Sequence, residues 1–253
     1  MDTSKYVDLH RGHNREYEIR VSNACEILKR LPLSNCRSLI DVGAGTGAML
    51  TAFIANGFGD DVKAIDGDWA LKSVSDNLRS KYEFRDLEQP LAIDRKYDVA
   101  VCLEVAEHLS PRRGPSLVTE LCLASDLVIF SAAVPGQGGV GHINEQKASY
   151  WVELFASNGF VCFDELRFSL PKNSYSWFRQ NLLIFARNQS NSYFGSSEVF
   201  GVPTFKGDYY AAEIMDEKLK NLKVFETSIG QCLQQGRSAL KVGNRKIVLS
   251  VET

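Results

Sequence analysis

A strand-like apolar segment runs directly into a glycine-rich turn at residues 39–47, whose sequence is LIDVGAGTG. Glycines in such a turn let the backbone approach a ligand closely, at positions where a Cβ atom would collide. A segment with helical spacing follows, so strand, turn and helix together predict the ligand-binding unit of an α/β fold. The GxGxG turn alone is weak evidence for one ligand, because dinucleotide-binding folds and ordinary tight turns share it.

The rest of the chain alternates between short apolar segments and longer helical ones. Strands are predicted at residues 38–42, 62–65, 82–84, 97–103, 127–133, 160–166 and 182–186, and helices at 48–56, 69–79, 115–124 and 145–158. This alternation predicts an α/β, Rossmann-like sheet of seven strands, mostly parallel, with helices on both faces. The ligand of such a sheet lies at the carboxyl ends of its strands.

Three regions are expected along the chain. Residues 1–37 form an N-terminal helical segment or lid with a helix over 17–31, residues 38–189 form the core, and residues 190–253 form a linker and a C-terminal helical extension. His10, Arg11 and His13 are candidates for a lid over the ligand, and a solvated terminus is the alternative. Residues 209–234 predict one amphipathic helix, which we expect to pack on the core; a homodimer contact or a substrate lid are the alternatives.

Charge and cysteine content limit the classes of partner. The 253 residues carry a formal net charge of −2, which makes nucleic acid an unlikely partner. Six cysteines without a CxxC pair indicate reduced thiols and a cytoplasmic protein. The N-terminus is too charged for a signal peptide, and no apolar run approaches the ~18 residues of a membrane span, so no membrane insertion is expected.

Two aspartates mark the ends of successive predicted strands. Asp66 ends the second strand, where a carboxylate can accept hydrogen bonds from both hydroxyls of a ribose. Asp86, followed by Leu87, ends the third strand, where a carboxylate can accept a hydrogen bond from an exocyclic amine. Each aspartate alone is more often a turn residue or helix cap. Their joint placement favours a nucleoside ligand.

These residues resemble the motifs of the class I S-adenosylmethionine-dependent methyltransferases across about residues 38–110. The resemblance is carried by DVGAGTG at 41–47, by Asp66 and Asp86, and by CLEVAEHL at 102–109. It implies that the methionine part of the cofactor faces the turn, that Asp66 binds the ribose and that Asp86 with Leu87 binds the adenine. The implied cofactor residues are Asp41, Gly43, Ala44, Gly45, Gly47, Asp66, Gly67, Asp86, Leu87 and Glu104. Trp69 is a candidate for packing on the adenine, and a core role for it is equally plausible.

A looser resemblance extends into the second half of the chain. Residues 130–146, 149–151 and 178–183 look like a bacterial branch of small methyltransferases associated with surface-polysaccharide or secondary-metabolite pathways. The substrates of that branch are diverse. It therefore implies a hydroxyl on a saccharide or another small polar metabolite as the acceptor.

Four titratable residues are candidates for the chemistry. Glu104, Glu107 and His108 are spaced to share one helical face after the fourth strand, and His142 lies in the glycine-rich loop after the fifth. Glu107, His108 and His142 are the catalytic candidates, with a histidine as the base that accepts the hydroxyl proton. All four are candidate ligands for a divalent metal such as Mg²⁺, because the pattern is similar to metal-dependent members of the superfamily, namely small-RNA 2′-O-methyltransferases and some quinone-biosynthesis O-methyltransferases. A metal-free loop is the alternative.

The leading hypothesis is therefore a methyltransferase that uses S-adenosylmethionine, releases S-adenosylhomocysteine and methylates an oxygen. One alternative is a metal-assisted RNA 2′-O-methyltransferase, which calls for more basic surface than this chain carries. A second alternative is a catalytically silent partner subunit that binds the cofactor, against which the intact glycine turn and both aspartates argue.

Overall fold

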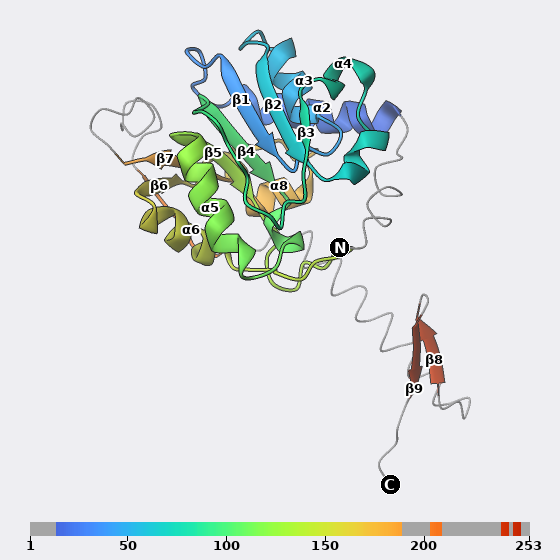
Figure 1. Ribbon diagram of the computed structural model, residues 1–253. Coiled ribbons are helices and arrows are strands. Elements are labelled where there is room, and N and C mark those ends of the chain that lie inside the picture. The colour runs from blue at the N-terminus through green and yellow to red at the C-terminus, as the bar shows by residue number, and fades with distance from the viewer. Residues whose placement is uncertain (1–13, 189–202, 209–238, 243–244, 249–253) are drawn as a thin grey trace. The chain divides into compact units, whose positions relative to one another are not determined.

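The computed structural model describes residues 14–188, 203–208, 239–242 and 245–248 (Figure 1). The chain divides into two compact units, Met1–Tyr209 and Tyr210–Thr253. In the second unit the described residues form a hairpin of β8 (Ala239–Val242) and β9 (Arg245–Val248), which the sequence reading did not predict. The predicted lid residues 10–13, most of the linker and the helix at 209–234 lie outside the described residues.

The first unit is built on a seven-stranded sheet in the order β3-β2-β1-β4-β5-β7-β6. Its strands are β1 (Ser38–Val42), β2 (Asp61–Asp66), β3 (Tyr82–Phe84), β4 (Val99–Leu103), β5 (Leu127–Ser131), β6 (Phe160–Phe163) and β7 (Leu183–Arg187). Neighbours from β3 to β5 are parallel, whereas β7 runs antiparallel to both β5 and β6. The strand order reverses between β1 and β4, the position at which α/β sheets bind ligands. The predicted α/β, Rossmann-like fold is thus confirmed.

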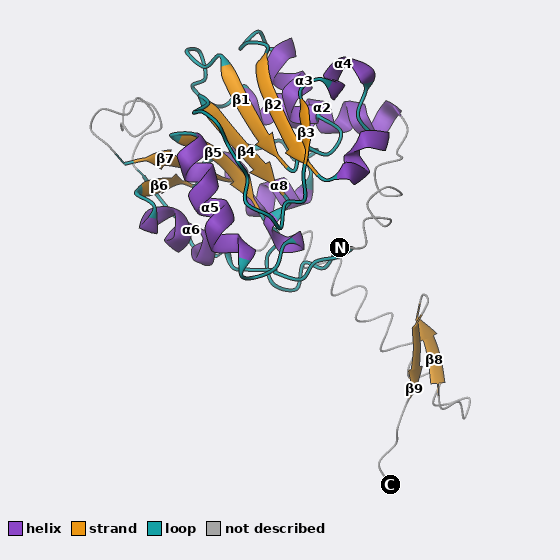
Figure 2. Cartoon of the chain, viewed as in Figure 1, coloured by secondary structure: helices purple, strands orange, loops and turns teal. Residues whose placement is uncertain are grey.

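Helices cover both faces of this sheet (Figure 2). The described elements of the unit are α2 (Asn14–Leu28), α3 (Ala48–Ala55), η1 (Asp68–Lys72), α4 (Asp76–Arg79), η2 (Ala106–His108), α5 (Arg113–Ala124), α6 (Ala148–Ser157), α7 (Leu166–Ser169) and α8 (Ser176–Asn181). Alternate residues of β4 serve the two cores: Val99 and Val101 pack in the core with α2 and α3, and Ala100 and Cys102 in the core with α5 and α6. Period-two burial on both faces explains why the central strands are apolar throughout.

Several predicted bounds are shifted, such as those of the helices expected over 17–31 and 145–158, which span Asn14–Leu28 and Ala148–Ser157. The helix expected over 69–79 is divided into η1 and α4, with residues 73–75 between them. The strand expected over 160–166 ends at Phe163, where the buried Asp164 carboxylate pairs with Arg167 of α7. In the part of the chain that the structure describes, no helix is both long and apolar enough to cross a membrane.

Candidate active site

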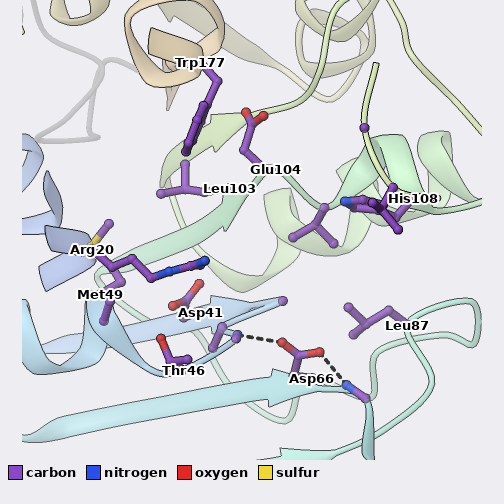
Figure 3. Close-up of a pocket in the computed structure, with 18 of the residues that line it drawn as sticks. Arg20, Asp41, Thr46, Met49, Asp66, Leu87, Leu103, Glu104, His108 and Trp177 are labelled. Carbon is purple, nitrogen blue, oxygen red and sulfur yellow. Dashed lines mark hydrogen bonds between the residues drawn. The ribbon is translucent and has the colours of Figure 1, made fainter. Parts of the chain in front are cut away.

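A cavity of about 850 Å³ opens where β1 to β4 end (Figure 3). Most of the residues singled out from the sequence line it, namely Asp41, Gly43, Ala44, Gly45, Asp66, Gly67, Trp69, Asp86, Leu87, Glu104, His108 and His142. Gly47 and Glu107 do not line it. The structure therefore brings nearly all of the candidate residues to one cavity.

The glycine turn shapes one wall of the cavity. Gly43 has a φ of 78° and a Cβ there would lie 2.2 Å from a methyl of Val105, so only glycine fits between the ends of β1 and β4. Gly47 caps the start of α3 with a φ of 81°, and a Cβ there would meet Leu78 and the Tyr82 hydroxyl within 3 Å. The turn is thus a backbone-lined hollow that side chains at these positions would fill.

Asp66 is held in place by the backbone around it. Its carboxylate accepts hydrogen bonds from the N–H of Gly45 at 2.7 Å and the N–H of Gly67 at 2.6 Å, with a further hydrogen bond from Trp69. Burial raises the pKa of Asp66 to about 6, although these three donors counteract the rise. The side chain is therefore fixed, acidic and ionised near neutral pH, as a ligand of two hydroxyls must be.

A second aspartate, Asp41, lies near Asp66 and differs from it in protonation. Asp41 is 4% exposed, and burial, followed by the nearby Asp66 carboxylate, raises its pKa to about 8. A buried carboxyl with so high a pKa binds a cationic ligand more strongly than a neutral one, because the ligand's charge offsets the cost of ionising it. The turn end of the cavity is accordingly suited to a positively charged group.

Glu104 lies at the end of β4 with a φ of 54°, an uncommon conformation for a residue other than glycine. Its carboxylate accepts hydrogen bonds from Asn181 Nδ2 at 3.1 and 3.2 Å and from Gln137 Nε2 at 3.3 Å. Burial raises the pKa of Glu104 despite these donors. The sequence reading missed Asn181 and Gln137, which reach Glu104 from α8 and from the loop after β5.

Glu107, His108 and His142 form a cluster in which one potential ligand atom of each lies within 4.8 Å of the others. The two imidazole rings meet edge to face, with centroids 4.7 Å apart. Glu107 is fully buried, neither of its carboxylate oxygens has a hydrogen-bond partner, and burial with the neighbouring Glu104 raises its pKa well above the usual range. Burial, with the nearby His142, lowers the pKa of His108 to about 4, so this imidazole is neutral at physiological pH.

Glu145 organises the loop that carries His142. Its carboxylate accepts hydrogen bonds from the N–H groups of Gly136 at 2.7 Å and Gly138 at 2.6 Å, and lies 2.9 Å from His142 Nδ1. Burial alone would raise the pKa of Glu145, but these hydrogen bonds outweigh it and the pKa is lowered. An ionised carboxylate can only accept, so Nδ1 of His142 carries the proton and Nε2 is the free acceptor.

Space in front of that free nitrogen depends on one glycine. A Cβ on Gly139 would lie 2.2 Å from His142 Nε2. The loop therefore keeps Nε2 clear by having no side chain at this position, a feature that the GQGGVG sequence alone does not reveal.

The remaining wall comes from residues that the sequence reading did not assign to the cavity. Arg20 extends from α2 into the cavity near Asp41 and is paired with Glu16 at 2.7 Å (Figure 3). Trp177 and Tyr175, stacked with ring centroids 4.3 Å apart, form an aromatic surface at the edge of α8. Arg20 lies in a helix with apolar residues three and four positions away. Nothing in the local sequence indicates that its own side of the helix faces the cavity.

Residues 12–118 match a family described as a methyltransferase domain. The match spans less than half of the 253 residues, so the chain is similar to this family over its N-terminal part. An O-methyltransferase family protein from Burkholderia thailandensis shares the methyltransferase fold, with a TM-score of 0.54 over 75% of this chain and 61% of that protein, at 12% identity.

Two curated methyltransferases of Rickettsia bellii are similar in sequence. Both are ubiquinone biosynthesis O-methyltransferases, 38% identical over 145 residues, which make up 55% of this chain and 53% of each relative. The chain thus spans about half the length of the curated relatives it matches. The family match ends before His142, Glu145 and Trp177, so it covers the methyltransferase's glycine turn and aspartates but not the histidine loop.

Proposed function

We propose that this methyltransferase transfers the methyl group of S-adenosylmethionine to a hydroxyl of a saccharide or another small polar metabolite. The observation that carries the proposal is that the glycine turn with Asp66 lines the same cavity as His142, which Glu145 holds by a hydrogen bond. One part is built to hold a nucleoside, and the other to accept a proton from a hydroxyl. The cavity is large enough for both ligands, since about 300 to 1,000 Å³ is typical of small-molecule sites.

The residues of the cavity fit this cofactor group by group. Asp66 is positioned to accept hydrogen bonds from the ribose hydroxyls, and Asp86 with Leu87 to bind the adenine. The backbone of Gly43 to Gly47 faces the methionine part, where Asp41 favours a positive charge and Arg20 is available to a carboxylate.

When bound, the cofactor supplies an electrophilic methyl carbon on a sulfonium, and the sulfur leaves as a thioether. The protein's own part is to hold the acceptor oxygen in line with that carbon and to remove its proton. His142 takes the proton at Nε2, while Glu145 stabilises the imidazolium through Nδ1. The acceptor packs against Trp177 and Tyr175, whose flat faces suit a sugar ring or a planar ring.

As the alternative to this metal-free base, we propose a divalent metal at Glu104, Glu107, His108 and His142, in which Nε2 of His142 binds the metal and not the proton. The buried Glu107 carboxyl supports this, because a cation would favour the ionised form that burial and the neighbouring Glu104 disfavour. The neutral His108 is in the form that binds metals, and Glu145 holds His142 as outer carboxylates hold metal-bound histidines. Two imidazoles suit Zn²⁺ at least as well as Mg²⁺.

Calorimetric titration with S-adenosylmethionine and S-adenosylhomocysteine, with and without Mg²⁺, Mn²⁺ or Zn²⁺, tests the binding part of the proposal. We expect micromolar affinity for both nucleosides and a separate heat of metal binding that His108→Ala removes. The reaction is tested by methyl transfer to a panel of sugars, phenols and short RNAs. Nucleoside binding without turnover on any class would favour the silent subunit, and turnover on RNA alone would favour the RNA methyltransferase.

A further inference from the structure

The loop that follows β3, residues 86–91, is fastened to α5 by one arginine. Arg113 is 5% exposed, and its guanidinium uses all of its N–H groups. Nε donates to the carbonyl of Leu87 at 2.8 Å and Nη2 to the carbonyl of Gln89 at 3.2 Å. The remaining hydrogen bonds go to Ser116 Oγ at 2.7 Å and to both oxygens of Glu120 at 2.6 and 3.1 Å.

The same loop is held at two more points. Glu120 accepts a hydrogen bond from the N–H of Leu91 at 3.1 Å. The Arg113–Glu120 pair therefore binds the loop through the carbonyls of Leu87 and Gln89 and the N–H of Leu91. Glu88 accepts hydrogen bonds from the N–H of Ser110 at 2.6 Å and from its hydroxyl at 2.9 Å. The loop is thus attached to α5 and to Ser110 by several charge-assisted hydrogen bonds, which are about twice as strong as neutral ones.

This attachment sets the direction of Asp86. Its Oδ1 accepts a hydrogen bond from the N–H of Glu88 at 3.0 Å, and its carbonyl accepts one from the N–H of Gln89 at 3.0 Å, so the aspartate is part of the turn that Arg113 grips. Asp86 lines the cavity. A carboxylate fixed in this way favours a ligand that presents an N–H donor and disfavours one that presents a carbonyl oxygen.

We propose that Arg113 is a positioning residue that makes the site select adenine over hypoxanthine. The inference rests on the proposed cofactor. At position 6 adenine carries an amine that can donate to Asp86, where hypoxanthine carries a carbonyl oxygen. The N–H donor of hypoxanthine is at the neighbouring N1, so a carboxylate held in one direction distinguishes the two bases. Arg113 touches neither base, and acts by fixing the loop through the Leu87 and Gln89 carbonyls. Lysine cannot replace it, because an ammonium lacks the planar fork that reaches both carbonyls and Glu120 together.

The test compares two ligands on the full chain by calorimetry: S-adenosylhomocysteine and S-inosylhomocysteine, which differ in the group at position 6 of the base and in the proton that hypoxanthine carries on N1. The wild type should bind the adenosyl ligand at least about tenfold more tightly, the range of one hydrogen bond to a charged group. In Arg113→Lys this ratio should fall to within about threefold. Arg187→Lys is the matched control, because Arg187 of β7 binds Asp126 and the Cys122 carbonyl, and none of these residues lines the cavity.

Each outcome separates the inference from the proposed function. If the wild type binds neither ligand, the proposal that the protein uses S-adenosylmethionine is refuted. A wild type that binds both equally, or an Arg113→Lys variant that keeps the full ratio, overturns the role of Arg113 and leaves the cofactor standing. If Arg113→Lys fails to fold, Glu120→Gln weakens the hydrogen bonds to Arg113 and Leu91. It should also lower the ratio of the two ligand affinities. Loss of the ratio in Arg187→Lys as well would show general destabilisation and refute the specific role.

Discussion

Replacing Asp41 with asparagine should stabilise the protein while weakening its proposed cofactor site. Asp41 ends β1 almost completely buried, and its pKa is raised from 3.8 to about 8. At pH 7 the carboxyl is therefore mostly protonated in the folded chain and ionised in the unfolded chain. Holding the proton across roughly three pH units costs about 4 kcal/mol at ~1.4 kcal/mol for each. Asparagine has the same size and no charge, so the variant should gain up to about 4 kcal/mol of unfolding free energy.

The pH dependence gives the sign of the effect. Because the pKa of Asp41 is higher in the folded chain, its contribution to stability is complete below about pH 4 and is lost as the pH rises toward 8. The difference between variant and wild type should therefore be small at pH 4 and grow up to pH 8. Urea denaturation followed by tryptophan fluorescence measures it, since Trp69, Trp151 and Trp177 all lie in the first unit.

Asp126→Asn provides a control of opposite sign. Burial would raise the pKa of Asp126, but Arg187 and Lys96 outweigh it and lower the pKa. This variant should lose stability at neutral pH, and the loss should disappear as the pH falls below about 4. If Asp41→Asn shifts stability equally at every pH, or destabilises the protein at pH 8, the assignment of a protonated Asp41 is wrong.

Three further predictions concern binding and turnover. Asp66→Ala should weaken S-adenosylhomocysteine binding by about ten- to a hundredfold, the range of hydrogen bonds to a carboxylate, and unchanged affinity in calorimetry would remove its ribose role. Glu145→Gln should lower kcat by about ten- to a hundredfold with little change in cofactor affinity, because His142 loses the charge that orients it; equal kcat in steady-state assays would contradict this. Chelation should abolish turnover if the metal acts in the reaction, with activity restored by added Zn²⁺, Mn²⁺ or Mg²⁺, and turnover that survives EDTA would leave His142 and Glu145 as a metal-free pair.

Much of the cofactor half could be predicted from the sequence because its signals are local. The glycine turn, Asp66 and Asp86 each follow directly on an apolar strand, and parallel strands bring their carboxyl ends to one edge. The ExxEH spacing predicted one helical face for Glu104, Glu107 and His108, but only the last two lie in the short η2 helix, and Glu104 precedes it. Such features depend on a few neighbouring residues, so they can be recognised without knowing how the rest of the chain folds.

The acceptor half could not be predicted in the same way because it depends on contacts between distant segments. Asn181 lies 77 residues from Glu104 along the chain, and Trp177 reaches the cavity from an unpredicted helix between two antiparallel strands. Glu145 appeared suited to a helix start, yet its carboxylate is used within the loop before α6. A glycine-rich loop has no regular repeat like that of a helix or strand, so the direction of its side chains cannot be predicted from the spacing of residues in the sequence.

The division of the cavity along the chain bears on how new acceptor ranges arise. Residues 41–109 supply most of the cofactor wall, whereas the aromatic wall comes from a short insertion between β6 and β7. Recombination or exchange of residues 166–181 with the equivalent insertion of a relative would replace the aromatic wall and leave the glycine turn and both aspartates unaltered. On the proposed function, a library at Tyr175 and Trp177 would sample new acceptors, whereas Arg167 and Asn181 of the same segment are buried and would be kept because they hold Asp164 and Glu104.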